Sequence, residues 1–396
     1  MNKKFAIIGG GIIGLATAYR LMQSKLADKI VIFEKEDNLG KHQSSHNSGV
    51  LHAGLYYKPG STKAVLAVNG IRQMIQFCQK EEIPHKICGK LVVATDNEEI
   101  HRLQNLFKQG NENGLVGLRL LDSRGIRLIE PYVNGVAAIH VPEEGIVDYP
   151  AVCKALARKI QEQGGEIKLN SRAKKISSFN DEWIIQTGSD EYACDFIINC
   201  AGLHCDRVAR MAGEKPDMQI VPFRGDYYKI KKERNDIVKN LVYPVPNPEF
   251  PFLGVHFTRM INGDLEAGPN AVLAFSREGY NFFQINPADL IEALTFRGLR
   301  KFLFSYPKMV RRELAISLSK SYFCKQLQRL VPDIRRGDLE KGNGGVRAQA
   351  LDLNGNLLQD FNILARKNAL HVLNAPSPGA TASLAIGEYI VSLLPG

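Results

Sequence analysis

The feature that most constrains this chain is a glycine cluster near its start, Gly9-Gly10-Gly11-Ile12-Ile13-Gly14. An apolar run before it, residues 5–8, predicts a strand buried on both faces, and the residues after it have helical spacing. A second apolar run, residues 30–33, closes a βαβ unit. In this position the pattern G-x-G-x-x-G predicts a dinucleotide site, because it lets a pyrophosphate approach the backbone at the N-terminus of a helix.

Glu34 strengthens this prediction. It follows Gly14 by twenty residues and ends the second predicted strand, where a carboxylate can accept hydrogen bonds from a ribose diol. We therefore expect Gly9, Gly11, Gly14 and Glu34 to bind a dinucleotide. Nicotinamide and flavin sites share this fingerprint, so other segments must distinguish them; the alternative is a generic βαβ turn with a surface glutamate.

Further motifs resemble a known family. The superfamily is indicated by GGGIIGLATAYRL, FEKE, HQSSHNSGVLHAGLYY, IINCAG and NAPSPGATASLAIGE, which are similar to the D-amino-acid-oxidase-type FAD oxidoreductases. Within that group, four motifs resemble the L-2-hydroxyglutarate dehydrogenases and oxidases: HNSGVLHAGLYYKPGS, PFRGDYY, LGVHFTR and GPNAVLAFSREGY. The similarity covers essentially the whole chain. It implies FAD as cofactor and oxidation of L-2-hydroxyglutarate to 2-oxoglutarate, with hydride transfer to flavin N5 and electrons passed to a quinone-type acceptor or to oxygen.

The resemblance also implies which residues line the cofactor. Besides the fingerprint, these are Ser44, Ser45, Gly49, Val50, Leu51, Ala173, Ala201, Gly202, Gly379 and Thr381. The last two precede a helix predicted from about 381 to 394. Its N-terminal dipole would favour negative charge on a reduced flavin by about 0.3–2 kcal/mol. A Pro/Gly loop that caps a core helix is the alternative interpretation of this segment.

Oxidation of a 2-hydroxy acid needs a base for the hydroxyl proton, and histidine suits this role because its unperturbed pKa is about 6.5. Among the nine histidines, His52 lies in the segment expected to face the flavin and His256 lies on a predicted strand of the second domain. Either could be the base while the other orients the substrate. A structural or surface role is the alternative for each of them.

Arg347 is the predicted ligand of the substrate carboxylate. It follows Gly344-Gly345, and guanidinium binds a carboxylate through two parallel hydrogen bonds. The family resemblance implies this contact, and a surface salt bridge is the alternative. The second carboxylate of a five-carbon substrate needs a further partner, for which the candidates are Arg224, Tyr227, Arg259 and Tyr57.

The predicted fold class is α/β, with a Rossmann-like FAD-binding domain and a second α+β substrate domain built on an antiparallel sheet. Glycine-rich α/β segments and strand-rich segments alternate along the chain, so both domains are expected to be discontinuous. We assign 1–80, 145–218 and 337–396 to the FAD-binding domain. The substrate domain takes 81–144 and 219–336.

The positive charge is concentrated in one segment. Residues 297–336 hold eleven Lys and Arg against two acids, so 11 − 2 = +9 of the net +10 lies there, interleaved with aromatic residues. Such a segment can dock on anionic lipid, each basic residue adding about 1 kcal/mol near the surface. We predict peripheral attachment at the inner face of the cell membrane, which would favour electron transfer to a quinone. A solvated basic face is the alternative.

Other features narrow the function further. The seven cysteines are scattered and contain no CxxC, so we expect a reducing, cytoplasmic compartment and no metal site. The apolar N-terminal run is too short and too glycine-broken for a membrane span. A small-molecule 2-hydroxy dicarboxylate is the expected substrate and no nucleic acid is expected. Two rival functions stay open: a glycine-oxidase-like amino-acid or amine oxidase, and an RNA-binding flavoprotein.

Overall fold

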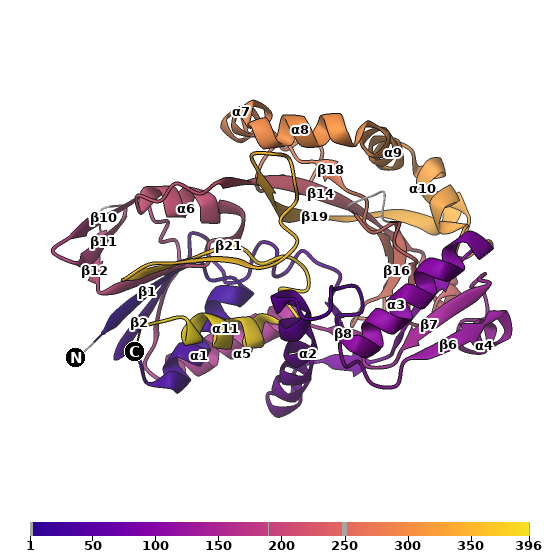
Figure 1. Cartoon of the computed structure of the whole chain (residues 1–396), viewed down its shortest axis with the longest axis horizontal. Helices are drawn as coiled ribbons and strands as arrows, with labels where there is room; N and C mark the ends of the chain where they lie inside the picture. Colours follow the sequence, from indigo (N-terminus) through magenta and orange to yellow (C-terminus); the bar gives the residue numbers. More distant parts are fainter. Residues whose placement is uncertain (1–2, 189, 248–251, 396) are drawn as a thin grey trace.

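The computed structural model describes residues 3–188, 190–247 and 252–395. Two large sheets organise the chain (Figure 1). The first has six strands in the order β20-β21-β13-β1-β2-β9, and only β20 runs antiparallel to its neighbour. Their bounds are Asn362–Ala365, Ala369–Asn374, Phe196–Asn199, Lys4–Ile8, Lys29–Phe33 and Glu166–Lys168.

Both faces of this sheet are buried, as the apolar runs predict. Phe5 and Ile7 of β1 point into one core, whereas Ala6 and Ile8 point into another, because successive side chains leave a strand on opposite faces. The first core is covered by α1 (Ile12–Ser24), α2 (Thr62–Lys80), α5 (Tyr149–Glu162) and α11 (Ser383–Ser392). The second lies beneath α6 (Cys205–Met211) and a three-stranded sheet, β10 (Lys175–Phe179), β11 (Glu182–Thr187) and β12 (Asp190–Cys194).

The second sheet is longer and strongly curved (Figure 1). Its order is β18-β14-β17-β16-β15-β5-β7-β6, and β19 pairs with β14. It is antiparallel as predicted, except that β15 and β5 pair in parallel. The bounds in that order are Val272–Leu273, Met218–Ile230, Leu265–Gly268, His256–Arg259, Leu241–Pro244, Lys90–Ala94, Ala137–Val141 and Arg119–Asp122, with β19 at Leu339–Asp352.

Helices cover the outside of this sheet. Four consecutive ones, α7 (Pro287–Thr295), α8 (Arg297–Ser305), α9 (Pro307–Leu318) and α10 (Lys320–Leu327), form an arc along its upper side (Figure 1). The helices α3 (Ile100–Glu112) and α4 (Ser123–Ile129) pack against β6 and β7. Among the described residues, no helix is both long and apolar enough to span a bilayer.

The placement of β19 corrects one predicted boundary. We assigned all of 337–396 to the FAD-binding domain, but β19 pairs with β14 from Met218↔Asp352 to Ile230↔Leu339 and so belongs to the second sheet. The pairing with β14 satisfies backbone hydrogen bonds along nearly the whole of β19. The remainder of the segment, β21 and α11, lies in the first domain. The predicted fold class, a parallel-sheet α/β domain with a second domain on an antiparallel sheet, is confirmed.

A small sheet joins the two domains. It consists of β3 (Val50–Leu51), β8 (Gly145–Val147) and β4 (His85–Ile87), in the order β3-β8-β4. His52 follows β3 directly, and Glu144 directly precedes β8. Because β3 and β8 are antiparallel neighbours, the end of one and the start of the other meet at the same place. This pairing brings together two residues that are 92 positions apart.

Candidate functional site

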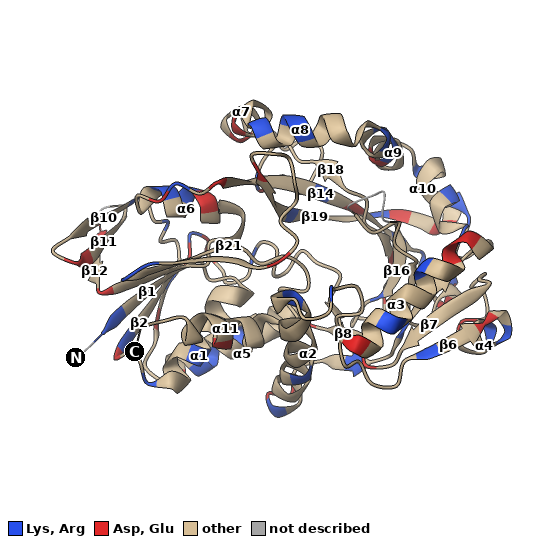
Figure 2. Ribbon diagram, viewed as in Figure 1, with Lys and Arg blue, Asp and Glu red and all other residues tan. Residues whose placement is uncertain are grey.

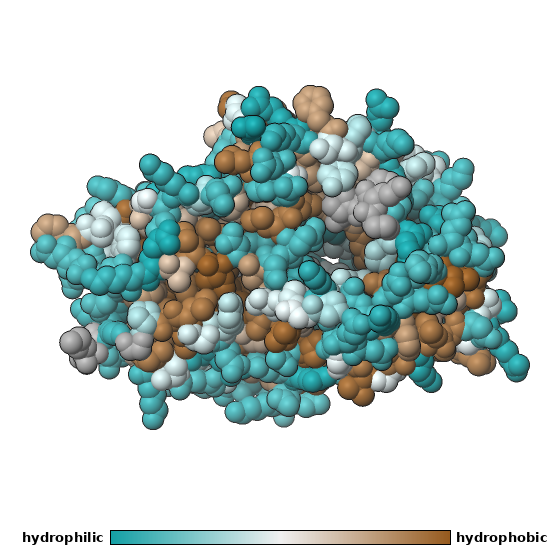
Figure 3. Space-filling view, viewed as in Figure 1, coloured by the Kyte–Doolittle hydropathy of each residue, from teal (hydrophilic) through white to brown (hydrophobic). Residues whose placement is uncertain are grey.

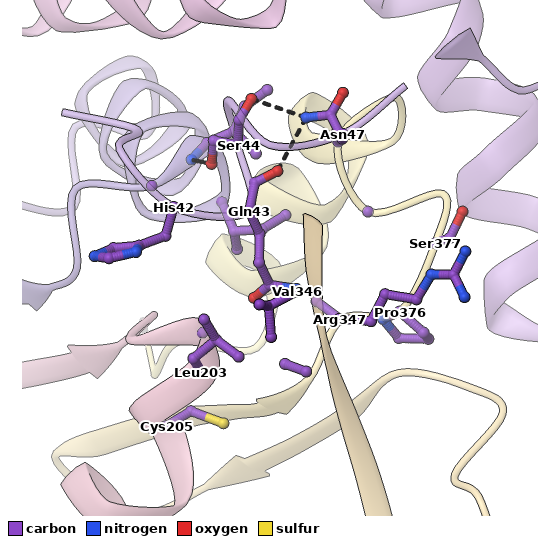
Figure 4. Close-up of a pocket in the computed structure, with 18 of the residues that line it drawn as sticks. His42, Gln43, Ser44, Asn47, Leu203, Cys205, Val346, Arg347, Pro376 and Ser377 are labelled. Atoms are coloured by element: carbon purple, nitrogen blue, oxygen red, sulfur yellow. Dashed lines mark hydrogen bonds between the residues drawn. The ribbon is translucent and has the colours of Figure 1, made fainter. Parts of the chain in front are cut away.

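A single cavity of about 820 Å³ runs between the two domains. It is lined by the β1–α1 turn, by residues from the segment 40–57, by residues 200–205 and by the approach to α11. The second domain contributes lining residues from β14, β15, β16 and β19. Figure 4 shows part of this wall, including the hydrogen bonds from the Asn47 amide to the carbonyls of Gln43 and Ser44. The predicted dinucleotide site and the predicted substrate residues thus share one cavity.

The glycine turn is packed too closely for side chains at two of its positions. Gly9 has φ +110°, and a Cβ there would lie 2.5 Å from the carbonyl oxygen of Cys200. A Cβ on Gly14 would lie 2.0 Å from the carbonyl oxygen of Gly9. Gly11 is different, because its Cβ would meet only the Ser44 hydroxyl, at 3.4 Å. Gly11 therefore opens the N-terminus of α1 to the cavity, where an anion is favoured.

Glu34 is held at the end of β2 by two backbone donors. Its carboxylate accepts hydrogen bonds from the N–H of Gly10 at 2.8 Å and of Glu36 at 2.9 Å. The side chain is buried yet lines the cavity. A carboxylate fixed in this way is ready to accept hydrogen bonds from a sugar diol.

Most residues predicted to touch the cofactor line this cavity, namely Gly9, Gly11, Glu34, Ser44, Val50, Ala173, Ala201, Gly202, Gly379 and Thr381. The other four lie behind its wall. Gly14 packs on the glycine turn, Ser45 is exposed and donates to the Gly40 carbonyl, Gly49 turns the chain beside Val147, and Leu51 is fully buried in the core. In a strand as short as β3, Val50 and Leu51 must face opposite sides.

The backbone of His52 is fixed from the C-terminal segment. The N–H of His52 donates to Thr381 Oγ1 at 3.2 Å, and the same hydroxyl donates to the carbonyl of Val50 at 3.1 Å. Tyr149 Oη lies 2.7 Å from this hydroxyl. Thr381 thereby connects the segment that precedes α11 to the strand β3, which His52 follows.

The ring of His52 faces a buried carboxylate. Its Nδ1 lies 3.6 Å from Glu144 Oε2, and Lys90 Nζ lies 2.6 Å from the same oxygen. Burial raises the pKa of Glu144, but the charge of Lys90 and the nearby ring of His52 outweigh it and lower the pKa to about 2. Sequence reasoning missed this pair, because Lys90 begins an apolar strand and such a position normally marks an exposed strand end.

His256 has a different environment. Its Nδ1 lies 2.9 Å from the carbonyl oxygen of Gly254, and its ring stacks on Tyr243 with centroids 3.8 Å apart. Burial lowers the pKa of His256 to about 3, so the ring is neutral and Nδ1 carries the proton that Gly254 accepts. Nε2 is then an acceptor. Both predicted histidines line the cavity.

Arg347 lies on β19, opposite Phe223 of β14, and lines the same cavity. Figure 4 draws its side chain among those that line the cavity. Its guanidinium carbon lies 6.0 Å from the centre of the Phe252 ring. Within the described ranges, no carboxylate forms an ion pair with Arg347. A cation in this state is available to an anionic ligand.

The four residues predicted as candidates for binding the second carboxylate of the substrate fall into two groups. Tyr57 and Tyr227 line the cavity. Arg224 is buried in an ion pair with Asp226, with Nε 2.9 Å from Oδ1, and Arg259 donates to backbone carbonyls that include Gly263. Neither arginine lines the cavity, so the prediction that either could bind the second carboxylate is wrong. Both guanidinium groups already interact with partners in the second sheet and its loops.

Sequence reasoning missed Lys63, which lines the cavity at the start of α2. Its Nζ lies 4.6 Å from the centre of the Tyr57 ring and donates to the Gln359 carbonyl at 3.0 Å. Burial lowers the pKa of Lys63 to about 8. A lysine in the first turn of an amphipathic helix normally faces solvent, so nothing in the sequence marked it.

The nucleotide end of the cavity is closed by a loop of the second domain. Glu278 Oε1 lies 2.7 Å from Lys35 Nζ and 2.8 Å from His204 Nε2. Tyr280 Oη lies 2.8 Å from His42 Nδ1. The ligand atoms of Glu36, His42 and Glu278 lie within 4.8 Å of one another, but the Lys35 ammonium already lies among them. This cluster therefore joins the domains without needing a metal.

The comparison with protein families identifies this architecture. A family model described as FAD dependent oxidoreductase matches residues 4–393. This chain belongs to that family. The cofactor of this FAD dependent oxidoreductase is FAD, as the motif resemblance predicted, and the residues present fit it: Gly11 leaves room at the N-terminus of α1, and Glu34 offers a fixed carboxylate to the ribose.

Curated relatives of this FAD dependent oxidoreductase are similar over nearly its whole length. The L-2-hydroxyglutarate dehydrogenase of Indibacter alkaliphilus is 50% identical over 391 residues, which cover 98% of each chain. The mitochondrial L-2-hydroxyglutarate dehydrogenase of Homo sapiens is 43% identical, covering 97% of this chain and 87% of that protein. The predicted family resemblance is confirmed.

Solved structures share the fold of this FAD dependent oxidoreductase. The L-alpha-glycerophosphate oxidase of Mycoplasma pneumoniae, determined with FAD bound, superposes with a TM-score of 0.80 at 24% identity and covers 100% of this chain and 95% of its own. Glycine oxidase from Geobacillus kaustophilus gives 0.74 at 18% identity, covering 99% and 95%. At these identities the likeness shows the architecture, and the chemistry of the substrate must come from the residues in the cavity.

Proposed function

We propose that this chain oxidises L-2-hydroxyglutarate to 2-oxoglutarate. The observation that carries the proposal is the presence, in one cavity, of an arginine without a carboxylate partner and a histidine backed by a buried carboxylate, Arg347 and His52. These are the two groups that a 2-hydroxy acid requires. The curated relatives, named L-2-hydroxyglutarate dehydrogenases, support the choice of substrate.

The residues divide the reaction between them. Arg347 binds the carboxylate next to C2 and so orients the C2–H and O–H bonds. His52 accepts the hydroxyl proton at Nε2, because its Nδ1 faces Glu144. FAD, when bound, supplies the acceptor for the hydride that leaves C2. Loss of one proton and one hydride converts the alcohol into the ketone.

His256 has the better geometry for a second, neutral role. Because Nδ1 donates to Gly254 and the ring stacks on Tyr243, the orientation of the imidazole is fixed. Its pKa of about 3 makes it a weak base, whereas His52 has a carboxylate that stabilises the protonated ring. We therefore assign proton transfer to His52 and orientation of the substrate hydroxyl to His256.

The distal carboxylate needs a cation or hydroxyl donors, and Lys63 with Tyr57 offers both. The ammonium of Lys63 lies over the Tyr57 ring, and both side chains line the cavity. Tyr227 lines it from β14. Lys63 is only partly hydrogen-bonded within the chain, through the Gln359 carbonyl, so it retains donors for a ligand.

Anaerobic titration of the yellow holoenzyme tests this function. L-2-hydroxyglutarate should bleach the visible flavin band, whereas D-2-hydroxyglutarate, L-glutamate and glycine should not. L-lactate, which lacks the distal carboxylate, should act only at much higher concentration. Bleaching by an amino acid in preference to the hydroxy acid would contradict the proposal and favour the amine-oxidase alternative. Addition of oxygen or a quinone analogue afterwards identifies the electron acceptor.

We further propose that the arc of helices α7 to α10 docks on an anionic membrane, where the electrons pass to a quinone. Figure 2 shows Lys and Arg along α8, α9 and α10, and Figure 3 shows apolar side chains among hydrophilic ones over α7 and α8. Phe304 is 85% exposed between the exposed bases Arg300 and Lys308. Phe302 and Phe323, counted among the interleaved aromatics in the sequence, are instead buried in the core.

Exposed apolar residues extend this surface beyond the basic segment 297–336. They include Phe283, Ile285, Ile291 and Leu294, and Leu314 and Leu318 are exposed within the segment itself. Large apolar side chains mixed with basic ones on a helical surface are typical of interfacial membrane binding. The basic residues would attract anionic headgroups, while the apolar ones would enter the boundary of the acyl chains.

A further inference from the structure

Behind His52, two side chains of opposite charge are almost completely removed from solvent. The Lys90 side chain is 0% exposed and that of Glu144 is 1% exposed, and their charged atoms lie 2.6 Å apart. The Lys90 ammonium lies between two aromatic rings, 4.7 Å from the centre of Tyr56 and 5.0 Å from the centre of Tyr243.

Stability alone does not explain this ion pair. Transfer of two charges into a low-dielectric interior costs free energy that their attraction only partly repays, and apolar residues of similar size often stabilise a protein more. Burial accordingly lowers the pKa of Lys90, although Glu144 opposes this effect. A buried pair beside a cavity is therefore a candidate for a role in that cavity.

The contacts of Glu144 point toward His52. Its Oε1 accepts a hydrogen bond from the N–H of Ala53 at 3.1 Å, and its Oε2 lies 3.6 Å from His52 Nδ1. The carboxylate thus contacts both the ring and the backbone that follows it. Its own main chain is fixed by the Gly89 N–H, which donates to the Glu144 carbonyl at 2.9 Å. Since Gly89 precedes Lys90, one short turn positions both members of the pair.

We propose that Glu144 and Lys90 are positioning residues for His52. Glu144 accepts the Nδ1 proton of His52, so that Nε2 faces the cavity without a proton, and Lys90 keeps Glu144 ionised while limiting its attraction for a proton on the ring. This inference rests on the proposed function for the identity of the proton that His52 takes from the substrate. The arrangement of the three side chains is independent of that identity.

The balance of charge explains why both residues are needed. Before proton transfer, the lysine and the glutamate neutralise each other and His52 is neutral. After transfer, His52 is an imidazolium beside Glu144. Without the carboxylate this cation would be poorly stabilised, and without the lysine the carboxylate would hold the proton too strongly for turnover. Three described groups interact with His52 directly, namely Glu144, Tyr243 and His256. Lys90, Arg347 and Tyr56 interact with these groups in turn.

Most of those neighbours do not change charge over the pH range of interest. Burial raises the pKa of Tyr56 and Tyr243, so both phenols stay neutral. Burial keeps His256 neutral above about pH 3. Arg347 stays cationic. A change in the titration of His52 on substitution of Glu144 or Lys90 can therefore be assigned to that substitution.

The test measures His52 directly in the holoenzyme. Diethyl pyrocarbonate acylates only unprotonated imidazole, and mass spectrometry of the peptide that contains His52 gives its rate at each pH. In Glu144→Gln the pH midpoint of this reaction should fall by about one unit or more, because an anion near the ring is lost. In Lys90→Met it should rise by a similar amount, because a cation is lost. The double variant should have a midpoint between those of the two single variants, because it loses the anion and the cation together.

Glu143→Gln is the matched control, since Glu143 is the adjacent residue, is more exposed and pairs with Arg72 at 3.8 Å. It should leave the midpoint unchanged. In both test variants the rate of anaerobic flavin reduction should fall at least tenfold while the FAD content is retained. If L-2-hydroxyglutarate fails to reduce the flavin of the unmodified enzyme, the proposed substrate is wrong, but the acylation profiles still test the positioning role.

Midpoints that stay the same, or that move in the same direction in both variants, would overturn the inference. If either variant fails to fold, the conservative variants Lys90→Arg and Glu144→Asp replace the original two. Lys90→Arg should keep the midpoint, because it keeps the charge. Glu144→Asp should lower it, because the shorter side chain withdraws from Nδ1. The reverse pattern in this pair would equally refute the positioning role.

Discussion

The hydroxyl of Thr381 donates a hydrogen bond to the carbonyl of Val50, which lies 331 residues earlier in the chain. The contact joins the approach to α11 to the strand that precedes His52. The last part of the sequence therefore controls the position of a residue predicted from the first part.

Substitution Thr381→Val should destabilise this junction. It leaves the His52 N–H without its partner, whereas the Val50 carbonyl still accepts from the Tyr149 hydroxyl at 2.9 Å, and an unsatisfied buried polar group costs about 1–3 kcal/mol. Urea unfolding of the holoenzyme measures the loss. Thr381→Ser keeps the hydroxyl and is the control, expected to lose less than half as much. Equal losses in the two variants would show that the methyl group, and not the hydrogen bonds, matters.

Alanine substitutions at two positions of the glycine turn should have different effects. Gly14→Ala places a methyl group 2.0 Å from a backbone oxygen, so the variant should be unstable with or without FAD. Gly11→Ala meets only the Ser44 hydroxyl at 3.4 Å, so the protein should fold but bind FAD weakly, because the methyl group enters the space of the pyrophosphate. The ratio of FAD to protein and a thermal melt separate the two effects. A Gly11→Ala enzyme with full FAD content would contradict this assignment.

Arg347 should contribute to substrate binding and not to FAD retention. Arg347→Met removes a charge-assisted pair of hydrogen bonds, worth about 1.5–3 kcal/mol, so kcat/KM should fall roughly 10- to 150-fold. Arg347→Lys should recover only part of this, because an ammonium cannot bind a carboxylate through two parallel bonds. Steady-state kinetics with L-2-hydroxyglutarate, together with the FAD content, check the prediction. Unchanged kinetics in Arg347→Met would remove Arg347 from the site.

Stability should fall as the pH drops below about 6.5. The folded pKa of His256 is about 3 and that of His371 about 4, both lowered first by burial, so the unfolded chain binds protons that the folded chain does not. Each such histidine removes up to about 1.4 kcal/mol per pH unit between its unfolded and folded pKa values.

Below pH 4.5, Glu144 should lower the stability further. Its pKa in the folded protein is about 2, and its stabilising contribution is lost as it becomes protonated. Urea unfolding between pH 7.5 and 5 isolates the histidines, and His256→Gln should flatten the slope. His101→Gln is the control, because His101 is exposed on α3. An equal slope in His256→Gln would contradict a buried neutral His256.

Membrane docking should depend on both charge and apolar contact. Co-sedimentation with vesicles of anionic lipid should exceed that with zwitterionic lipid and should decrease at high salt. Phe304→Ser should reduce it at low salt, and Arg300→Glu should reduce it further. Phe179→Ser is a matched control, since Phe179 is exposed at the end of β10, far along the chain from this surface. Equal binding to both lipid types would exclude the docking surface.

Much of the fold follows from local patterns. The strand runs of β1 and β2, the glycine turn, the helical spacing of α1 and the final helix, α11, correspond to the observed elements within a few residues. These elements depend on burial and backbone geometry that neighbouring residues in the chain impose. The membership of β19 did not follow, since a glycine-rich segment is compatible with either domain until its partner strand is known.

The sequence by itself determined the βαβ unit, the family and the residue types that the cavity needs: two histidines, an arginine and a fingerprint carboxylate. Only the tertiary structure decided how these are used. It excluded Arg224 and Arg259, whose charges are satisfied elsewhere. It brought Lys63 to the cavity and placed Lys90 and Glu144 behind His52. The reason is physical: the role of a charged side chain depends on which partners and how much solvent surround it, and those come from strands and loops far apart in the chain.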